Sequence, residues 1–219
     1  VNGSTFTVDS TVDVSASGTL TIESGATFDG SGTLINDGTF DQQNTTWSFG
    51  GTIDLYTGVT TSGAWTISSG GILNIRSGAF TLNSGGTLTI DSGGTLDIIS
   101  GGTLTLESGS TFTQSNTSWT INGTLLLYIS FEILSGYTWT VSSTGILNIQ
   151  SGGELISSGT LTINTDGAFN IIYGGTLTLN SGSTFTQSNT WTIDGTLNLY
   201  ISYTILNTFT WTFSSTGIL

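Results

Sequence analysis

Residues 85–116 read GGTLTIDS, GGTLDIIS, GGTLTLES and GSTFTQSN, so one octad occurs four times in succession without an insertion. Each octad combines a strand of about five residues with a Ser-Gly-Gly turn. Side chains alternate along a strand, so Leu88 and Ile90 face one side while Thr87 and Thr89 face the other. The apolar side is expected to face a core and the hydroxyl side to face water. Glycine permits the positive φ of a tight corner.

A longer repeat contains the octads. Residues 101–147 and 174–219 read almost alike once a single gap is allowed, and a diverged copy begins at Gly38. Short, regular periods are typical of solenoids, in which each coil stacks on the last. We therefore predict one continuous β-solenoid over 1–219, with diverged N-terminal coils at 1–37 and super-repeats at about 38–108, 109–181 and 182–219, the last incomplete.

The composition favours strands and turns over helices. Thr, Val, Ile and aromatic residues suit strands, and Gly, Ser, Asn and Asp suit turns. The expected fold is all-β, a parallel β-helix (β-solenoid) of octad strand–turn units with about three super-repeats of roughly 73 residues. Three octads per coil would take about 24 residues and give about nine coils, at the strand spacing of a β-sheet. Trp47 and Trp65, like Trp119 and Trp139, lie closer in sequence than three octads, which suggests shorter coils in places and leaves coil size open.

The composition and the net charge exclude several classes of function. The chain has no Cys or His, its single basic residue is Arg76, and its formal net charge is −13. These features argue against disulfides, thiol chemistry, the usual zinc and iron sites, and a nucleic-acid partner. No apolar run is long enough to span a bilayer, so membrane insertion is not expected. We also predict no cofactor. The sequence has no initiator Met or leader, which suggests a processed or trimmed product.

The fourteen acidic residues are the only candidate catalytic groups. Glycan-cleaving β-helices that work with carboxylates alone need those carboxylates clustered. Here they are scattered, for example at Asp54, Asp91, Asp97, Glu107, Glu132, Glu154, Asp166 and Asp194. The octads also lack the second Gly and the Asp of the calcium-binding GGxGxD repeat. We therefore predict solvated surface charge, no catalytic residue, no metal site and no enzymatic activity.

Thr-x-Thr pairs are abundant, for example at Thr87/Thr89, Thr103/Thr105, Thr111/Thr113, Thr176/Thr178 and Thr184/Thr186. Ice-binding solenoids display such pairs as a ladder on one face. Octad spacing places successive pairs on successive faces, and threonine is in any case a good strand former. The spacing thus favours an ordinary solvated surface, whereas a ladder on a single face would favour ice binding.

Aromatic residues and sequons supply the remaining candidate sites. Six tryptophans occupy the Leu position of the octad and are predicted to form a core aromatic stack: Trp47, Trp65, Trp119, Trp139, Trp191 and Trp211. Five residues form either a cover over turns or a lateral contact patch: Tyr56, Tyr128, Tyr200, Leu126 and Phe131. Sequons at Asn2, Asn44, Asn116 and Asn122 permit glycosylation, at about the number that chance predicts.

Both ends of the sequence read as open. The chain stops within a unit, at SSTGIL, and begins within a strand-like segment, VNGSTFTV. Neither end has the polar cap that a free solenoid needs. Either the chain continues, or its ends stack on neighbouring subunits as a head-to-tail homopolymer, with Phe6 and Ile218 in the end-to-end contact.

The SGGTLTI-type octads with paired-glycine corners resemble the β-solenoid stalks of AIDA-like autotransporter passengers and haemagglutinin-type secreted adhesins. The resemblance covers essentially the whole chain. It implies a secreted rod or fibre at the cell surface and transfers no catalytic residue. The leading interpretation is a structural subunit of an extracellular filament or adhesin stalk, with surface glycans as a further partner. The alternatives are an ice- or carbohydrate-binding solenoid and, third, a glycan-cleaving β-helix.

Overall fold

The computed structural model describes residues 4–42, 46–205 and 209–219, and the regular secondary structure of these residues is entirely β-strand. The octads fold as predicted, although their strands are slightly shorter than expected. In β13 (Thr87–Ile90) the side chains of Leu88 and Ile90 are fully buried, while Thr87 and Thr89 are half-buried. The rest of each octad forms the corner.

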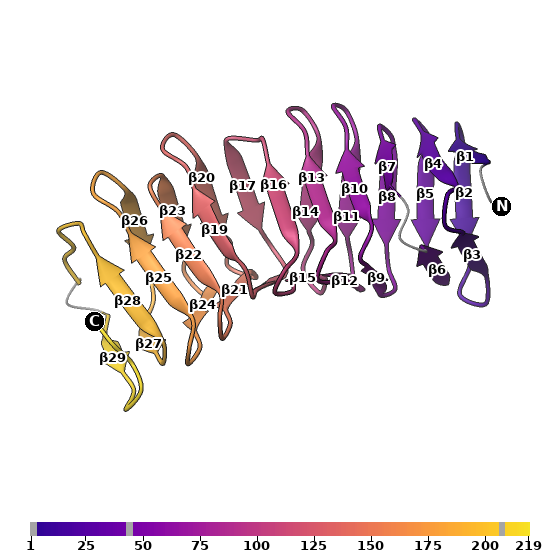
Figure 1. Ribbon diagram of the computed structural model, residues 1–219. Helices are drawn as coiled ribbons and strands as arrows, with labels where there is room; N and C mark the ends of the chain where they lie inside the picture. Colours follow the sequence, from indigo (N-terminus) through magenta and orange to yellow (C-terminus); the bar gives the residue numbers. More distant parts are fainter. Residues whose placement is uncertain (1–3, 43–45, 206–208) are drawn as a thin grey trace. The chain divides into compact units, whose positions relative to one another are not determined.

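The chain divides into two compact units, Val1–Asn116 and Thr117–Leu219. In the first unit, strands three apart in the sequence lie side by side and pair in parallel (Figure 1). One set of strands is β1 (Thr5–Val8), β4 (Thr27–Gly30), β7 (Thr46–Phe49), β10 (Ala64–Ile67), β13 and β16 (Thr111–Gln114). A second is β2 (Thr11–Val14), β5 (Thr33–Asn36), β8 (Thr52–Leu55), β11 (Ile72–Ile75) and β14 (Thr95–Ile98). A third is β3 (Thr19–Ile22), β6 (Thr39–Gln42), β9 (Val59–Thr61), β12 (Ala79–Leu82) and β15 (Thr103–Leu106).

The second unit repeats this arrangement in three sets of parallel strands. The first is β17 (Ser118–Ile121), β20 (Thr138–Val141), β23 (Thr160–Ile163) and β26 (Thr184–Gln187). The second is β18 (Thr124–Leu127), β21 (Ile146–Ile149), β24 (Ala168–Ile171), β27 (Trp191–Ile193) and β29 (Trp211–Phe213). The third is β19 (Ser130–Ile133), β22 (Glu154–Ser157), β25 (Thr176–Leu179) and β28 (Thr196–Leu199).

Three strands therefore complete one coil, and the strands β1 to β29 make a parallel β-solenoid of about nine turns. Coil length is not uniform. Thr87 pairs with Thr111, exactly three octads further along the chain, whereas Trp47 pairs with Trp65 across an interval shorter by most of an octad. The expected coil of three octads thus occurs only where complete octads follow one another, and shorter corners remove residues elsewhere.

The core is a set of apolar rows that run from coil to coil. Tryptophans one coil apart lie in contact, with ring centroids 4.0 Å apart for Trp47 and Trp65 and 4.8 Å apart for Trp119 and Trp139. Five of the six tryptophans are buried, and Trp211 on β29 is half-buried. The short intervals between these tryptophans in the sequence are therefore the lengths of single coils.

The super-repeat does not contain a whole number of coils. Residues 38–108 hold the ten strands β6 to β15, and residues 109–181 hold the ten strands β16 to β25. Because ten is not a multiple of three, an equivalent strand in the next copy belongs to a different sheet. In the second unit, Trp119 on β17 and Trp191 on β27 are equivalent in sequence and lie in different sheets.

Candidate functional site

Of the five residues predicted as a cover over turns or a lateral contact patch, the four in the second unit do not share one face. Tyr128 follows β18 and Tyr200 follows β28, so within the second unit they lie at the ends of strands in different sheets. Phe131 is in register with the buried Leu155 and stacks on Trp139 at 5.0 Å, so it belongs to the interior. The ten-strand super-repeat explains this, because it places the equivalent residues of the next copy in a different sheet. Leu126 is half-buried on β18, and Tyr56 belongs to the first unit.

The sequons divide into two groups. Asn2 and Asn44 lie outside the described residues. Asn116 is half-buried; its Nδ2 donates to the carbonyl oxygen of Gly94, and its Oδ1 accepts from the backbone N–H of Gly93. This amide already bridges one corner to the next coil, so a glycan on Nδ2 would compete with a structural hydrogen bond. Asn122 is half-buried, and its carbonyl oxygen accepts from Thr144 Oγ1 at 2.9 Å.

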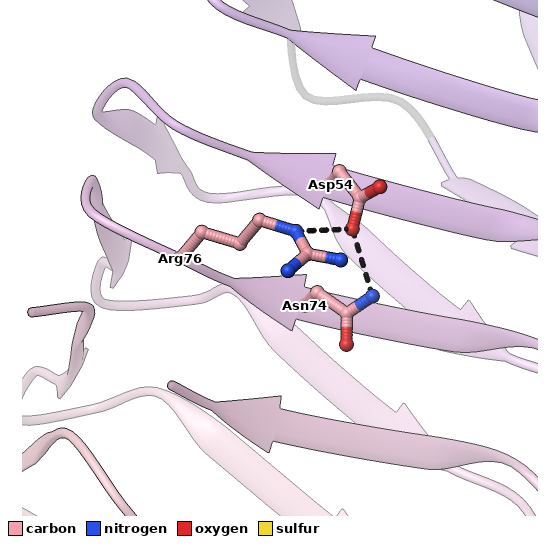
Figure 2. A network of polar contacts seen from close by, with 3 residues as sticks. All are labelled: Asp54, Asn74 and Arg76. Atoms are coloured by element: carbon pink, nitrogen blue, oxygen red, sulfur yellow. Dashed lines mark hydrogen bonds and ion pairs between the residues drawn. The ribbon is translucent and has the colours of Figure 1, made fainter. Parts of the chain in front are cut away.

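A polar row on β8, β11 and β14 lies beside Arg76, the single basic residue of the chain, which follows β11. Asp54, Asn74 and Asp97 occupy neighbouring positions on these three strands. Arg76 Nε and Asn74 Nδ2 donate to the same carboxylate oxygen of Asp54, at 2.8 and 2.7 Å (Figure 2). The Arg76 guanidinium also lies 5.6 Å from the ring centre of Tyr56.

The contacts of this row join adjacent coils and do not form a catalytic arrangement. The hydrogen bond that Arg76 donates to Asp54 is the main cause that raises the pKa of Arg76, which keeps the guanidinium charged. Asp54 Oδ1 is occupied by two donors, and Asn74 separates Asp54 from Asp97. The arrangement therefore ties adjacent coils together on the surface and offers no acid–base pair.

Asp97 gives the row a testable pH dependence. Burial raises the pKa of the Asp97 carboxyl, and the positive charge of Arg76 partly opposes this shift. A raised pKa means that the contribution of Asp97 to stability is complete below its unfolded pKa of about 3.9 and is lost as the pH rises through the folded value. We expect Asp97→Asn to raise the thermal unfolding temperature at pH 7 and to leave it nearly unchanged at pH 3. A variant that is less stable than the parent at pH 7 would contradict this assignment.

Hollows on the described surface include the following three, and none of these three has the features of a catalytic cleft. A hollow of about 300 Å³ is lined by Phe6, Leu20, Ile22 and Ala26 with Glu23 as its only acid. One of about 380 Å³ lies beside Leu197, Tyr200 and Leu219. One of about 340 Å³ contains Gln187 and Trp191, with Asp166 as its only acid. Within the described residues, no group of three His, Cys, Asp or Glu side chains could hold a metal ion.

Threonine pairs an octad apart lie on successive faces, as expected, but in the second unit four strands of one sheet also carry such pairs in a row. The strands β17, β20, β23 and β26 each direct two hydroxyl side chains outward, and these are Ser118, Thr120, Thr138, Thr140, Thr160, Thr162, Thr184 and Thr186. We call these eight residues the threonine face. Consecutive octads lie on successive faces, whereas strands three apart return to the same face, so the octad spacing alone does not show this row.

The sequence carries the signal for this face, although octad spacing hides it. The motif Ser/Thr-apolar-Thr begins at Ser118, Thr138, Thr160 and Thr184, and the interval grows from each copy to the next. These intervals are the lengths of successive coils, because each of the four residues pairs with the next one in the row. A search at a fixed period misses the motif, whereas a search that allows the coil length to vary would find it.

No protein-family model and no curated protein matches the sequence. Among solved structures, similarity is found to the TibC-catalysed hyper-glycosylated fragment of TibA, which is 17% identical, with 99% of this chain and 96% of that chain covered. The TM-score is 0.20, so the likeness carries no argument about function. In the part of the chain that the structure describes, no helix has the length and apolarity needed to cross a membrane.

Proposed function

We propose that the chain is a non-catalytic structural β-solenoid that serves at the cell surface, as a subunit of an extracellular filament or an adhesin stalk. The observation that supports this most directly is that nearly all of the described chain is spent on stacked coils. In both units, successive coils join through parallel backbone ladders around a buried apolar core. Such a fold supplies stiffness and length, because each coil bonds to the coils before and after it.

Assembly through the ends is part of this proposal. On β1, Phe6 is 36% exposed, stacks on Phe28 at 5.8 Å and lines the apolar hollow beside Leu20 and Ile22. In the second unit, Ile218 is 59% exposed, and its backbone pairs with that of Thr196 on β28. Exposed apolar side chains beside backbone groups that can extend a ladder are the features of a self-associating edge. A head-to-tail contact of this kind propagates as a fibre.

The proposal is tested by negative-stain electron microscopy and light scattering of the full chain. The parent is expected to form filaments, and the double variant Phe6→Lys/Ile218→Lys is expected to stay dispersed, because each lysine places a charge in the contact. Tyr173→Lys is the matched control, since Tyr173 is 68% exposed and follows β24, whereas Ile218 pairs with β28 in another sheet. Filaments that form equally well from the double variant would overturn assembly through the ends.

A further inference from the structure

The threonine face is regular in both directions. Across the strands, Ser118 pairs with Thr138, Thr138 with Thr160 and Thr160 with Thr184. The row beside it on the same strands contains Thr120, Thr140, Thr162 and Thr186. Ladder geometry sets the spacing at about 4.8 Å between strands and about 6.6 Å between the two rows. Eight hydroxyl groups thus form a two-dimensional lattice.

Strand propensity does not account for this distribution. If threonine were present only because it suits a solvated strand, hydroxyl pairs would occur equally on all three sides of the second unit. Only β25 carries a complete pair among β19, β22, β25 and β28. The strands β18, β21 and β24 carry no complete pair, and their outward positions include Leu126, Ile146 and Asn148. At β27 and β29, the exposed Thr190 and Thr210 directly precede the strands and complete pairs with Thr192 and Thr212. All four strands of the threonine face carry a complete pair.

The hydroxyl groups of the face are available to a ligand. No hydrogen bond within the described residues engages any of the eight hydroxyls, and all eight side chains are half-buried or exposed. The four strands carry no charged residue, which would hold its own hydration shell. Each threonine adds a methyl group beside a hydroxyl that can donate one hydrogen bond and accept two. The face therefore combines hydrogen-bonding points with apolar spacers that restrict where water can lie.

The interior beneath the face holds the lattice in position. The residues between the paired hydroxyls are Trp119, Trp139, Leu161 and Phe185, and all four are buried. Threonine is also stiff at χ1, so its hydroxyl loses little rotational freedom when it binds. A preorganised array has a smaller entropic cost of binding than a flexible one.

We propose that the threonine face is a binding surface for ice, in which the two rows of hydroxyls anchor ordered water of the crystal. A periodic, uncharged array fits a periodic ligand that both donates and accepts hydrogen bonds. Crystalline polysaccharide is the competing periodic ligand, and it is less well matched because sugars are commonly held by exposed aromatic rings, whereas Trp119 and Trp139 point inward. This inference goes beyond the structural function proposed above and does not depend on assembly.

The test is partition of the full chain into slowly grown polycrystalline ice, with thermal hysteresis as a second readout. The parent is expected to concentrate in the ice fraction. Thr140→Lys and Thr162→Lys, at the centre of the array, are expected to lose that enrichment, because a long charged side chain holds the crystal surface away. Thr176→Lys is the matched control, since it makes the same change at a half-buried outward threonine of β25, in another sheet. It should partition like the parent.

A folding control keeps the result interpretable. Circular dichroism would follow the unfolding temperature of each variant, and Thr120→Lys supplies a second position, which is exposed, if a central variant unfolds. Exclusion of the parent from ice would overturn the proposal, as would equal partition of Thr140→Lys and the parent. Binding of the parent to crystalline cellulose that Thr140→Lys abolishes, without enrichment in ice, would assign the face to polysaccharide instead. Filament formation is measured separately, so either proposal can fail alone.

Discussion

Replacing Trp139 with alanine is expected to lower the free energy of unfolding by about 3–5 kcal/mol, the usual loss for a buried aromatic residue. The indole of Trp139 is 1% exposed. It meets Trp119 edge-on at 4.8 Å and stacks on Phe131 at 5.0 Å, so truncation would leave a cavity that touches two other rings. Strands β17 and β23 hold the backbone on both sides of β20, which prevents the coils from closing over the gap. Chemical denaturation followed by intrinsic fluorescence and circular dichroism measures the change.

Trp211→Ala is the matched control for this substitution. Trp211 lies on β29, is half-buried, and contacts Trp191 at 5.0 Å and Tyr203 at 4.9 Å. Its truncation removes a similar volume at a site that solvent already reaches, so the loss should be clearly smaller than for Trp139. Losses below about 1 kcal/mol for both variants would mean that the tryptophan rows are not a packed core.

Alternation within the octad predicts most of the fold, because it depends on only two properties of a residue. Leu88 and Ile90 are fully buried, and their threonine neighbours face outward, as the alternation of a strand requires. The tryptophans are found inside for the same reason, since each occupies a leucine position. The repeated Gly-Gly corner then limits each strand to one side of a coil, and this predicts a solenoid without any long-range information.

The placement of side chains around the coil could not be predicted, because it depends on the length of every corner. Paired strands are separated by three full octads at Thr87 and Thr111 but by a much shorter interval at Trp47 and Trp65. One residue more or less in a corner does not change the alternation within a strand. The sequence pattern therefore looks regular, although the sequence interval between paired strands changes. For this reason the sequence pattern does not reveal that Tyr128 and Tyr200 follow strands of different sheets, or that the threonine face lies on one sheet.

The second glycine of a corner, Gly153, is expected to be far less replaceable than the first, Gly152. A Cβ atom at Gly153 would lie 2.1 Å from the carbonyl oxygen of Leu127 in the preceding coil. That oxygen accepts the backbone N–H of Gln150 at 2.9 Å, so relieving the clash would disturb a ladder hydrogen bond. Gly153→Ala should therefore destabilise by about 3 kcal/mol or more, at or above the upper end for an overpacked site.

Gly152→Ala is the control within the same corner, and it separates conformational strain from steric exclusion. Gly152 has a φ of +81°, and a Cβ atom there would meet nothing within 4 Å. Its replacement should cost only the left-handed conformation, about 1–2 kcal/mol, and Asp166 already tolerates that conformation at the equivalent position, with a φ of +68°. Thermal unfolding of the two single variants gives the comparison. If Gly152→Ala is the more damaging change, backbone conformation limits the corner. If Gly153→Ala is the more damaging change, glycine is required at position 153 because successive coils approach closely there, and not because of a positive φ.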